Sequence, residues 1–173
     1  MQLVNADRQL VIKFVQGAPF FLIIESVNEL RKVVDDFILS TEDGTDTWIL
    51  SEGEEILKKD PLIEFIFSPW TIDVNQKKIQ KALLSTVIKM IRQGVEEEHA
   101  QSILKEMNIM LGNINIEMGC DFDYTADDIT VILKGCDIRF IPEEDILIRI
   151  SQYIKICSEF LNTKLFVFCG ARS

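Results

Sequence analysis

The spacing of hydrophobic residues predicts strands alternating with helices. Phe20 to Ile24 and Leu165 to Cys169 are continuous apolar runs, a pattern typical of strands buried on both faces of a mostly parallel sheet. Shorter strands are predicted at Trp48 to Leu50, Leu62 to Phe67 and Ile138 to Ile141. This order of elements favours an α/β fold whose head contains a mostly parallel sheet.

Helical spacing predicts the remaining elements. The predicted helices span residues 26–40, 73–92, 96–111, 125–134 and 142–161. Ser26 and Glu29 have the spacing of a capping box at the start of the first helix. Pro142 opens the last helix and places Glu143, Glu144 and Asp145 in its first turn, next to the positive end of the helix dipole.

The break at Gln93-Gly94 predicts that the second and third helices fold back on each other as an antiparallel hairpin. Residues 73–113 are therefore predicted to form a helical leg subdomain. Residues 1–72 and 114–173 are predicted to form the α/β head. A length of 173 residues favours one domain with such an appendage.

The composition limits the function and the compartment. Lys and Arg number 18 against 28 Asp and Glu, so the net charge is −10. An acidic chain is not expected to bind nucleic acid or an anionic membrane non-specifically over its whole surface. One basic face is still compatible with this net charge. The spacing of the four cysteines fits neither a CxxC pair nor a zinc site, and residues 1–25 lack the pattern of an export signal. A cytoplasmic location without membrane insertion is expected.

The predicted helix from Asp73 to Arg92 separates two kinds of residue. At 100° per residue, Lys81, Lys89 and Arg92 all fall within roughly 60° of Lys78, and the apolar residues lie opposite. No acidic residue occurs between Asp73 and Glu96. Two interpretations remain open: acids from elsewhere in the fold pair with this face, or it contacts the phosphate backbone of a nucleic acid without reading its sequence.

Four carboxylates crowd together shortly before the next predicted helix. Asp121, Asp123, Asp127 and Asp128 are oxygen ligands of the kind that a hard cation such as calcium prefers. The spacing is not that of an EF-hand, because Ala126 occupies the position that requires glycine. The alternative is structural, since acidic residues and Thr125 suit the start of a helix.

Enzymatic chemistry has little support in the sequence. The chain lacks the GxxxxGK[ST] phosphate-binding loop, and His99 is its single histidine. Catalytic triads and histidine-rich metal centres are therefore nearly excluded. Two alternatives to nucleic-acid binding remain: a metal-dependent ATPase or nuclease of α/β fold, and an acidic protein-interaction scaffold that uses loop 41–60.

Several short segments occur in an order shared with a known family. They are Phe21 to Ser26, Pro69 to Ile79, Asp127 to Lys134, Ile150 to Ile154 and Lys164 to Phe168. The most specific are the Asp-x-Asn-x-Lys-Lys-Ile motif that begins at Asp73 and the closing Lys-Leu-Phe-Val-Phe strand. Together they resemble the Csn family, the small accessory proteins of type II-A CRISPR adaptation modules.

The resemblance implies a non-catalytic protein of antiviral defence that takes part in spacer acquisition. It implies an α/β head distantly like a P-loop ATPase core, a helical leg, and a ring-shaped homotetramer that binds double-stranded DNA ends through a lysine-lined hole. Calcium, the CRISPR integrase complex and the RNA-guided effector nuclease are the implied cofactor and partners. Members of the family continue with a further helix and strand where this chain stops at Ser173.

Carried onto this sequence, the resemblance implies two sets of site residues. The candidate DNA contacts are Lys77, Lys78, Lys81, Lys89 and Arg92. The candidate calcium ligands are Asp121, Asp123, Asp127 and Asp128. A ring with an acidic outside and a basic hole would confine DNA to the hole, which reconciles the net charge with DNA binding.

Overall fold

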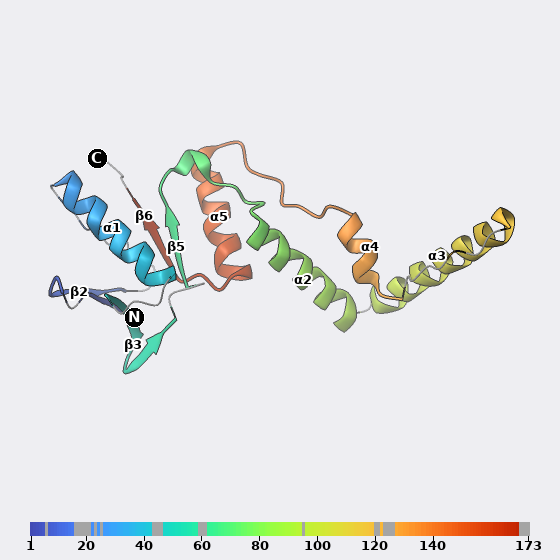
Figure 1. Ribbon diagram of the computed structural model, residues 1–173, viewed down its shortest axis with the longest axis horizontal. Coiled ribbons are helices and arrows are strands. Elements are labelled where there is room, and N and C mark those ends of the chain that lie inside the picture. The colour runs from blue at the N-terminus through green and yellow to red at the C-terminus, as the bar shows by residue number, and fades with distance from the viewer. Residues whose placement is uncertain are drawn as a thin grey trace. The chain divides into compact units, whose positions relative to one another are not determined.

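The computed structural model describes residues 1–5, 7–15, 22, 24, 26–42, 47–58, 62–94, 96–119, 122 and 127–169. The chain divides into two compact units (Figure 1). Unit 1 comprises Met1–Pro69 and Asn162–Ser173, and unit 2 comprises Trp70–Leu161. Within the described ranges, no helix is both long enough and apolar enough to cross a lipid bilayer.

The elements of unit 1 are mostly short strands. They are β1 (Gln2–Asn5), β2 (Leu10–Lys13), α1 (Val27–Glu42), β3 (Trp48–Glu52), β4 (Glu55–Leu57), β5 (Ile63–Ile66) and β6 (Leu165–Phe168). The 3-10 turn η1 (Pro69–Thr71) leads into unit 2. The helices of unit 2 are α2 (Lys77–Gln93), α3 (Glu96–Met118), α4 (Ile129–Gly135) and α5 (Ile146–Phe160).

The predicted mostly parallel, P-loop-like sheet is wrong. Unit 1 contains an antiparallel four-stranded sheet in the order β2-β1-β3-β4 and a separate two-stranded sheet in which β5 and β6 run parallel. Local turns explain the difference, because antiparallel neighbours need only a short connection whereas parallel strands need a crossover. Gly53, at a φ of 63°, makes the turn from β3 to β4. A positive φ of this kind is readily available to glycine.

Two predicted strands differ from the structure or lie outside it. Of the run from Phe20 to Ile24, only Leu22 and Ile24 are among the described residues, and neither belongs to a strand. Residues 138–141 are not a strand either. The backbone of Phe140 instead hydrogen-bonds to the side chain of Asn75. The predicted strands at Trp48, at Leu62 to Phe67 and at the end of the chain correspond to β3, β5 and β6.

The core of unit 1 is built around three aromatic rings. Phe37 of α1 lies 4.8 Å from the ring of Trp48 and 5.0 Å from that of Phe65. Trp48 is 1% exposed and Leu50 is fully buried. Residues of both sheets and of α1 join this cluster. Burial of apolar area, at about 25 cal/mol per Å², therefore ties the helix to the strands.

Helix α1 begins with half of the predicted capping box. The backbone N–H of Glu29 donates to the hydroxyl oxygen of Ser26 at 3.4 Å. The carboxylate of Glu29 accepts hydrogen bonds from the side chains of Lys32 and Arg8. Arg8 also pairs with Asp36 at 3.1 Å. These contacts join α1 to the turn between β1 and β2.

In unit 2, the apolar side of α2 contacts α5 and α4. Ile79 of α2 and Cys157 of α5 are fully buried, and Tyr153 is 2% exposed. The helix ends at Gly94, where a Cβ atom would lie 2.8 Å from the carbonyl oxygen of Met90. Only glycine fits there without a shift of the backbone, so the conformation at the end of α2 requires glycine at position 94.

The predicted antiparallel hairpin of α2 and α3 is wrong. Figure 1 shows α3 leading away from the end of α2 rather than folding back along it. Ala100 and Leu104 in the first half of α3 pack with Ile129 of α4 and with Ile91 of α2. The second half leaves large apolar side chains at least 39% exposed, namely Ile109, Met110, Ile114, Ile116 and Met118. The periodicity predicted the helix, but it could not tell which element covers its stripe.

The starts of α4 and α5 also differ from those predicted. Asp128 caps α4, in place of a start at Thr125, which lies outside the described residues. Asp145 caps α5, so Pro142 precedes the helix. The reason is hydrogen bonding, because an aspartate carboxylate that accepts from the free N–H groups of the first turn fixes where the helix begins.

Candidate nucleic-acid interface

Two side chains fix the turn before α2. The Asp73 carboxylate accepts a hydrogen bond from the backbone N–H of Asn75 at 2.8 Å. The Asn75 amide donates to the carbonyl oxygen of Phe140 at 3.0 Å and accepts from its N–H at 2.9 Å. These residues are the Asp and Asn of the Asp-x-Asn-x-Lys-Lys-Ile motif. Their contacts give this part of the motif a structural role, which is to orient the beginning of α2.

All five candidate DNA contacts lie on α2 and are exposed. We call this set the basic face: Lys77, Lys78, Lys81, Lys89 and Arg92. Lys78 and Arg92 are separated along the helix by roughly 21 Å, at about 1.5 Å per residue. The fully buried Ile79 lies on the other side of the helix. Packing of the apolar side thus points the cations towards solvent.

The interpretation that acids from elsewhere in the fold pair with the basic face holds for only part of it. Lys77, Lys81 and Lys89 form no ion pair with any residue in the described ranges. Arg92, in contrast, pairs with Asp128 at the start of α4. An acid from elsewhere in the fold, Asp128, therefore neutralises one end of the face, and within the described ranges the three lysines have no such partner.

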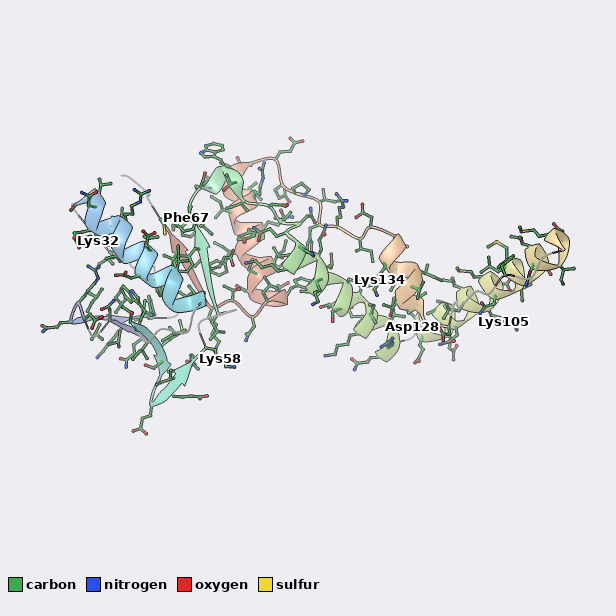
Figure 2. The ribbon with its side chains drawn as sticks, viewed as in Figure 1. Lys32, Lys58, Phe67, Lys105, Asp128 and Lys134 are labelled. Carbon is green, nitrogen blue, oxygen red and sulfur yellow. The ribbon has the colours of Figure 1, made fainter. Side chains whose placement is uncertain are left out.

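The Arg92 contact is a cluster of three side chains around Asp128, which Figure 2 labels at the start of α4. Arg92 Nη2 donates to Asp128 Oδ2 at 2.7 Å and lies 3.5 Å from the hydroxyl of Thr130. The other carboxylate oxygen, Asp128 Oδ1, accepts from the N–H of Thr130 at 2.9 Å and from its hydroxyl at 2.8 Å. Hydrogen bonds from Thr130, together with the guanidinium of Arg92, lower the pKa of Asp128 because they stabilise its charged form.

The four candidate calcium ligands are only partly described. Asp121 and Asp123 lie outside the described residues. Asp127 is exposed, and both oxygens of Asp128 are engaged by Thr130 and Arg92. Among the described side chains, no group of three or more His, Cys, Asp or Glu residues is arranged to hold a metal ion. The calcium site stays a prediction.

The sequence interpretation missed the pairing between the two candidate sites. The resemblance implies that Arg92 contacts DNA and that Asp128 binds calcium, yet each is the other's partner in the structure. They are 36 positions apart, so no local spacing pattern connects them. One feature of the sequence bears on this pairing. Aspartate is a favoured helix cap, and a carboxylate that caps a helix is held at the start of that helix.

Comparison with known proteins adds no family. No protein-family model matches the chain, and no curated protein matches it. The resemblance to the Csn family therefore rests on the segments quoted above.

Proposed function

We propose that this protein binds double-stranded DNA through the basic face of α2, without reading its sequence and without catalysing a reaction. The supporting observation is the exposure of Lys77, Lys81 and Lys89, which have no carboxylate partner in the described ranges. Ammonium groups contact phosphate oxygens, which are the same at every base pair, so this binding is independent of sequence.

The acidic remainder of the chain makes such binding selective for one face. The net charge is −10, whereas α2 carries cations and no acidic residue. Repulsion elsewhere on the surface would direct a polyanion towards α2.

The biological setting in this proposal rests on the sequence resemblance. It places the protein in CRISPR spacer acquisition, as a ring-shaped homotetramer that binds DNA ends and holds calcium. The proposed cytoplasmic location rests instead on the cysteine spacing and on the lack of an export-signal pattern in residues 1–25. The integrase complex and the RNA-guided effector nuclease are the proposed partners. The alternative of an α/β ATPase or nuclease was favoured by the α/β pattern and by the cluster of aspartates. The predicted parallel sheet is not the one formed, and the aspartate cluster is only partly among the described residues.

The proposal is tested by reversing charge on the basic face. The double variant Lys81→Glu with Lys89→Glu is compared with a control double variant, Lys13→Glu with Lys58→Glu. The control makes the same change of charge at exposed positions of unit 1. Binding to a blunt-ended duplex is measured by fluorescence anisotropy at several salt concentrations.

We expect the α2 variant to lose at least tenfold in affinity and to show a shallower salt dependence. The slope of log K against log salt is negative, and each phosphate that is no longer neutralised reduces its magnitude by about 0.9. Equal losses in the two double variants would remove the basic face from the proposal. Equal affinity for linear and closed circular DNA would contradict the preference for ends, and light scattering with and without calcium tests the tetramer.

A further inference from the structure

Arg92 stands apart from Lys77, Lys81 and Lys89 because it already has an anionic partner in the described part of the chain. Its Nη2 atom lies 2.7 Å from Asp128 Oδ2. The two side chains are 54% and 43% exposed, so a ligand in solvent can reach the pair. A backbone phosphate offers the guanidinium the same kind of acceptor as a carboxylate does.

Asp128 cannot follow Arg92 towards a ligand. Its Oδ1 atom is held by the N–H and the hydroxyl of Thr130, at 2.9 and 2.8 Å. Leaving that position would expose the first turn of α4 without its cap. An arginine that binds phosphate must therefore either give up Asp128 or bring the phosphate close to a fixed carboxylate, and like charges at such distances repel each other.

We propose that Asp128 restrains DNA binding by competing with backbone phosphate for Arg92. The inference rests on the proposed function and adds a residue that sets its strength. In this arrangement the lysines make the first contacts with DNA. Arg92 joins them only when a phosphate replaces Asp128 as the partner of its guanidinium. Contacts that fail to reach the Arg92 end of α2 gain nothing from this arginine, which disfavours partial contacts relative to full ones.

The test removes the charge of Asp128 and keeps its cap. Asn is about as good as Asp at the start of a helix, so Asp128→Asn can still accept from Thr130. The matched control is Asp127→Asn, which changes the net charge equally at the neighbouring position, where the carboxylate is exposed. Binding to a blunt-ended duplex is measured against salt concentration in EDTA, so that no divalent cation competes for either carboxylate.

We expect Asp128→Asn to bind DNA about two- to fivefold more tightly than Asp127→Asn, the range for loss of one exposed ion pair. Its salt slope should be steeper by about 0.9, the value of one additional phosphate. Adding Arg92→Gln to Asp128→Asn should abolish this gain. Far-UV circular dichroism of each variant checks that α4 is retained.

Equal affinity and slope in the two Asp→Asn variants would overturn the inference. Weaker binding by Asp128→Asn would also overturn it, because Asp128 would then hold Arg92 in place for DNA. A chain that binds no DNA in its natural form removes the proposed function as well. The titration of the unaltered protein reports that failure separately from the comparison of the variants.

Discussion

The side chain of Asn75 satisfies both backbone groups of Phe140, accepting from its N–H at 2.9 Å and donating to its carbonyl oxygen at 3.0 Å. This contact joins the turn before α2 to the segment before α5. We expect Asn75→Ala to lower the free energy of unfolding by about 1–3 kcal/mol, since two partly buried backbone groups lose their partner. Urea unfolding followed by circular dichroism measures the loss.

Asn113→Ala is the control for this prediction, because Asn113 is an exposed residue of α3. Its effect should stay within about 0.5 kcal/mol. A loss no larger in Asn75→Ala than in the control would contradict a stabilising role for the Asn75 contact.

The start of α5 gives a second prediction. Asp145 accepts hydrogen bonds from the N–H groups of Leu147 at 2.8 Å and Ile148 at 3.1 Å. Asp145→Ala should therefore destabilise the protein by about 1 kcal/mol, and Asp145→Asn should retain most of the stability. Urea unfolding of both variants is compared with that of Glu144→Ala. A helix that began at Pro142 instead would give Glu144→Ala the larger loss.

The contacts of the Glu29 carboxylate predict that the stability of the protein depends on pH in the acidic range. The hydrogen bond from Lys32, and after it that from Arg8, holds the pKa of Glu29 below its ordinary value of 4.5. A lowered pKa in the folded state means that the stabilisation is present above the unfolded pKa and is lost as pH falls through the folded one. We expect Lys32→Gln to raise the pKa of Glu29 more than Arg8→Gln does.

Nuclear magnetic resonance titration of the side-chain carbon of Glu29 measures this pKa in each variant. Lys58→Gln, an exposed change in the same unit, should leave the pKa of Glu29 unaltered. An ordinary pKa in the natural sequence would show that Glu29 makes no such contacts in solution.

The cysteines predict an order of chemical labelling. Cys136 is exposed, Cys169 is half-buried and Cys157 is buried. Burial raises the pKa of the Cys169 thiol, and the thiolate is the reactive form. Among these three cysteines, which are the ones in the described ranges, iodoacetamide should therefore modify Cys136 first, then Cys169, and Cys157 only in urea. Peptide mass spectrometry follows each site, and rapid labelling of Cys157 without urea would be inconsistent with the packing of α5.

The helices could be predicted because their signals are local. Ser26 and Glu29 mark the start of α1 within four positions, and the end of α2 has glycine at a position where a Cβ would meet the carbonyl oxygen of Met90 one turn earlier. The pairing of strands has no comparable signal. β6 follows β5 by about a hundred residues of chain, and the register between them depends on the core that both strands share.

The candidate site was predictable to the same extent. The basic face follows from the periodicity of α2, since the apolar and charged positions separate on one helix. The pairing of Arg92 with Asp128 depends on how α4 docks beside the end of α2. Docking is a tertiary property, so it left no pattern in the spacing of either residue.

The two tryptophans are distributed one to each unit. Trp48 of unit 1 is 1% exposed, whereas Trp70, the first residue of unit 2, is 77% exposed. Their emission should differ in colour and in sensitivity to a soluble quencher, because indole fluorescence reports the polarity around the ring. Replacing either residue by Phe leaves a single optical reporter. The sequence thus carries a built-in means of following each unit separately during unfolding or DNA titration.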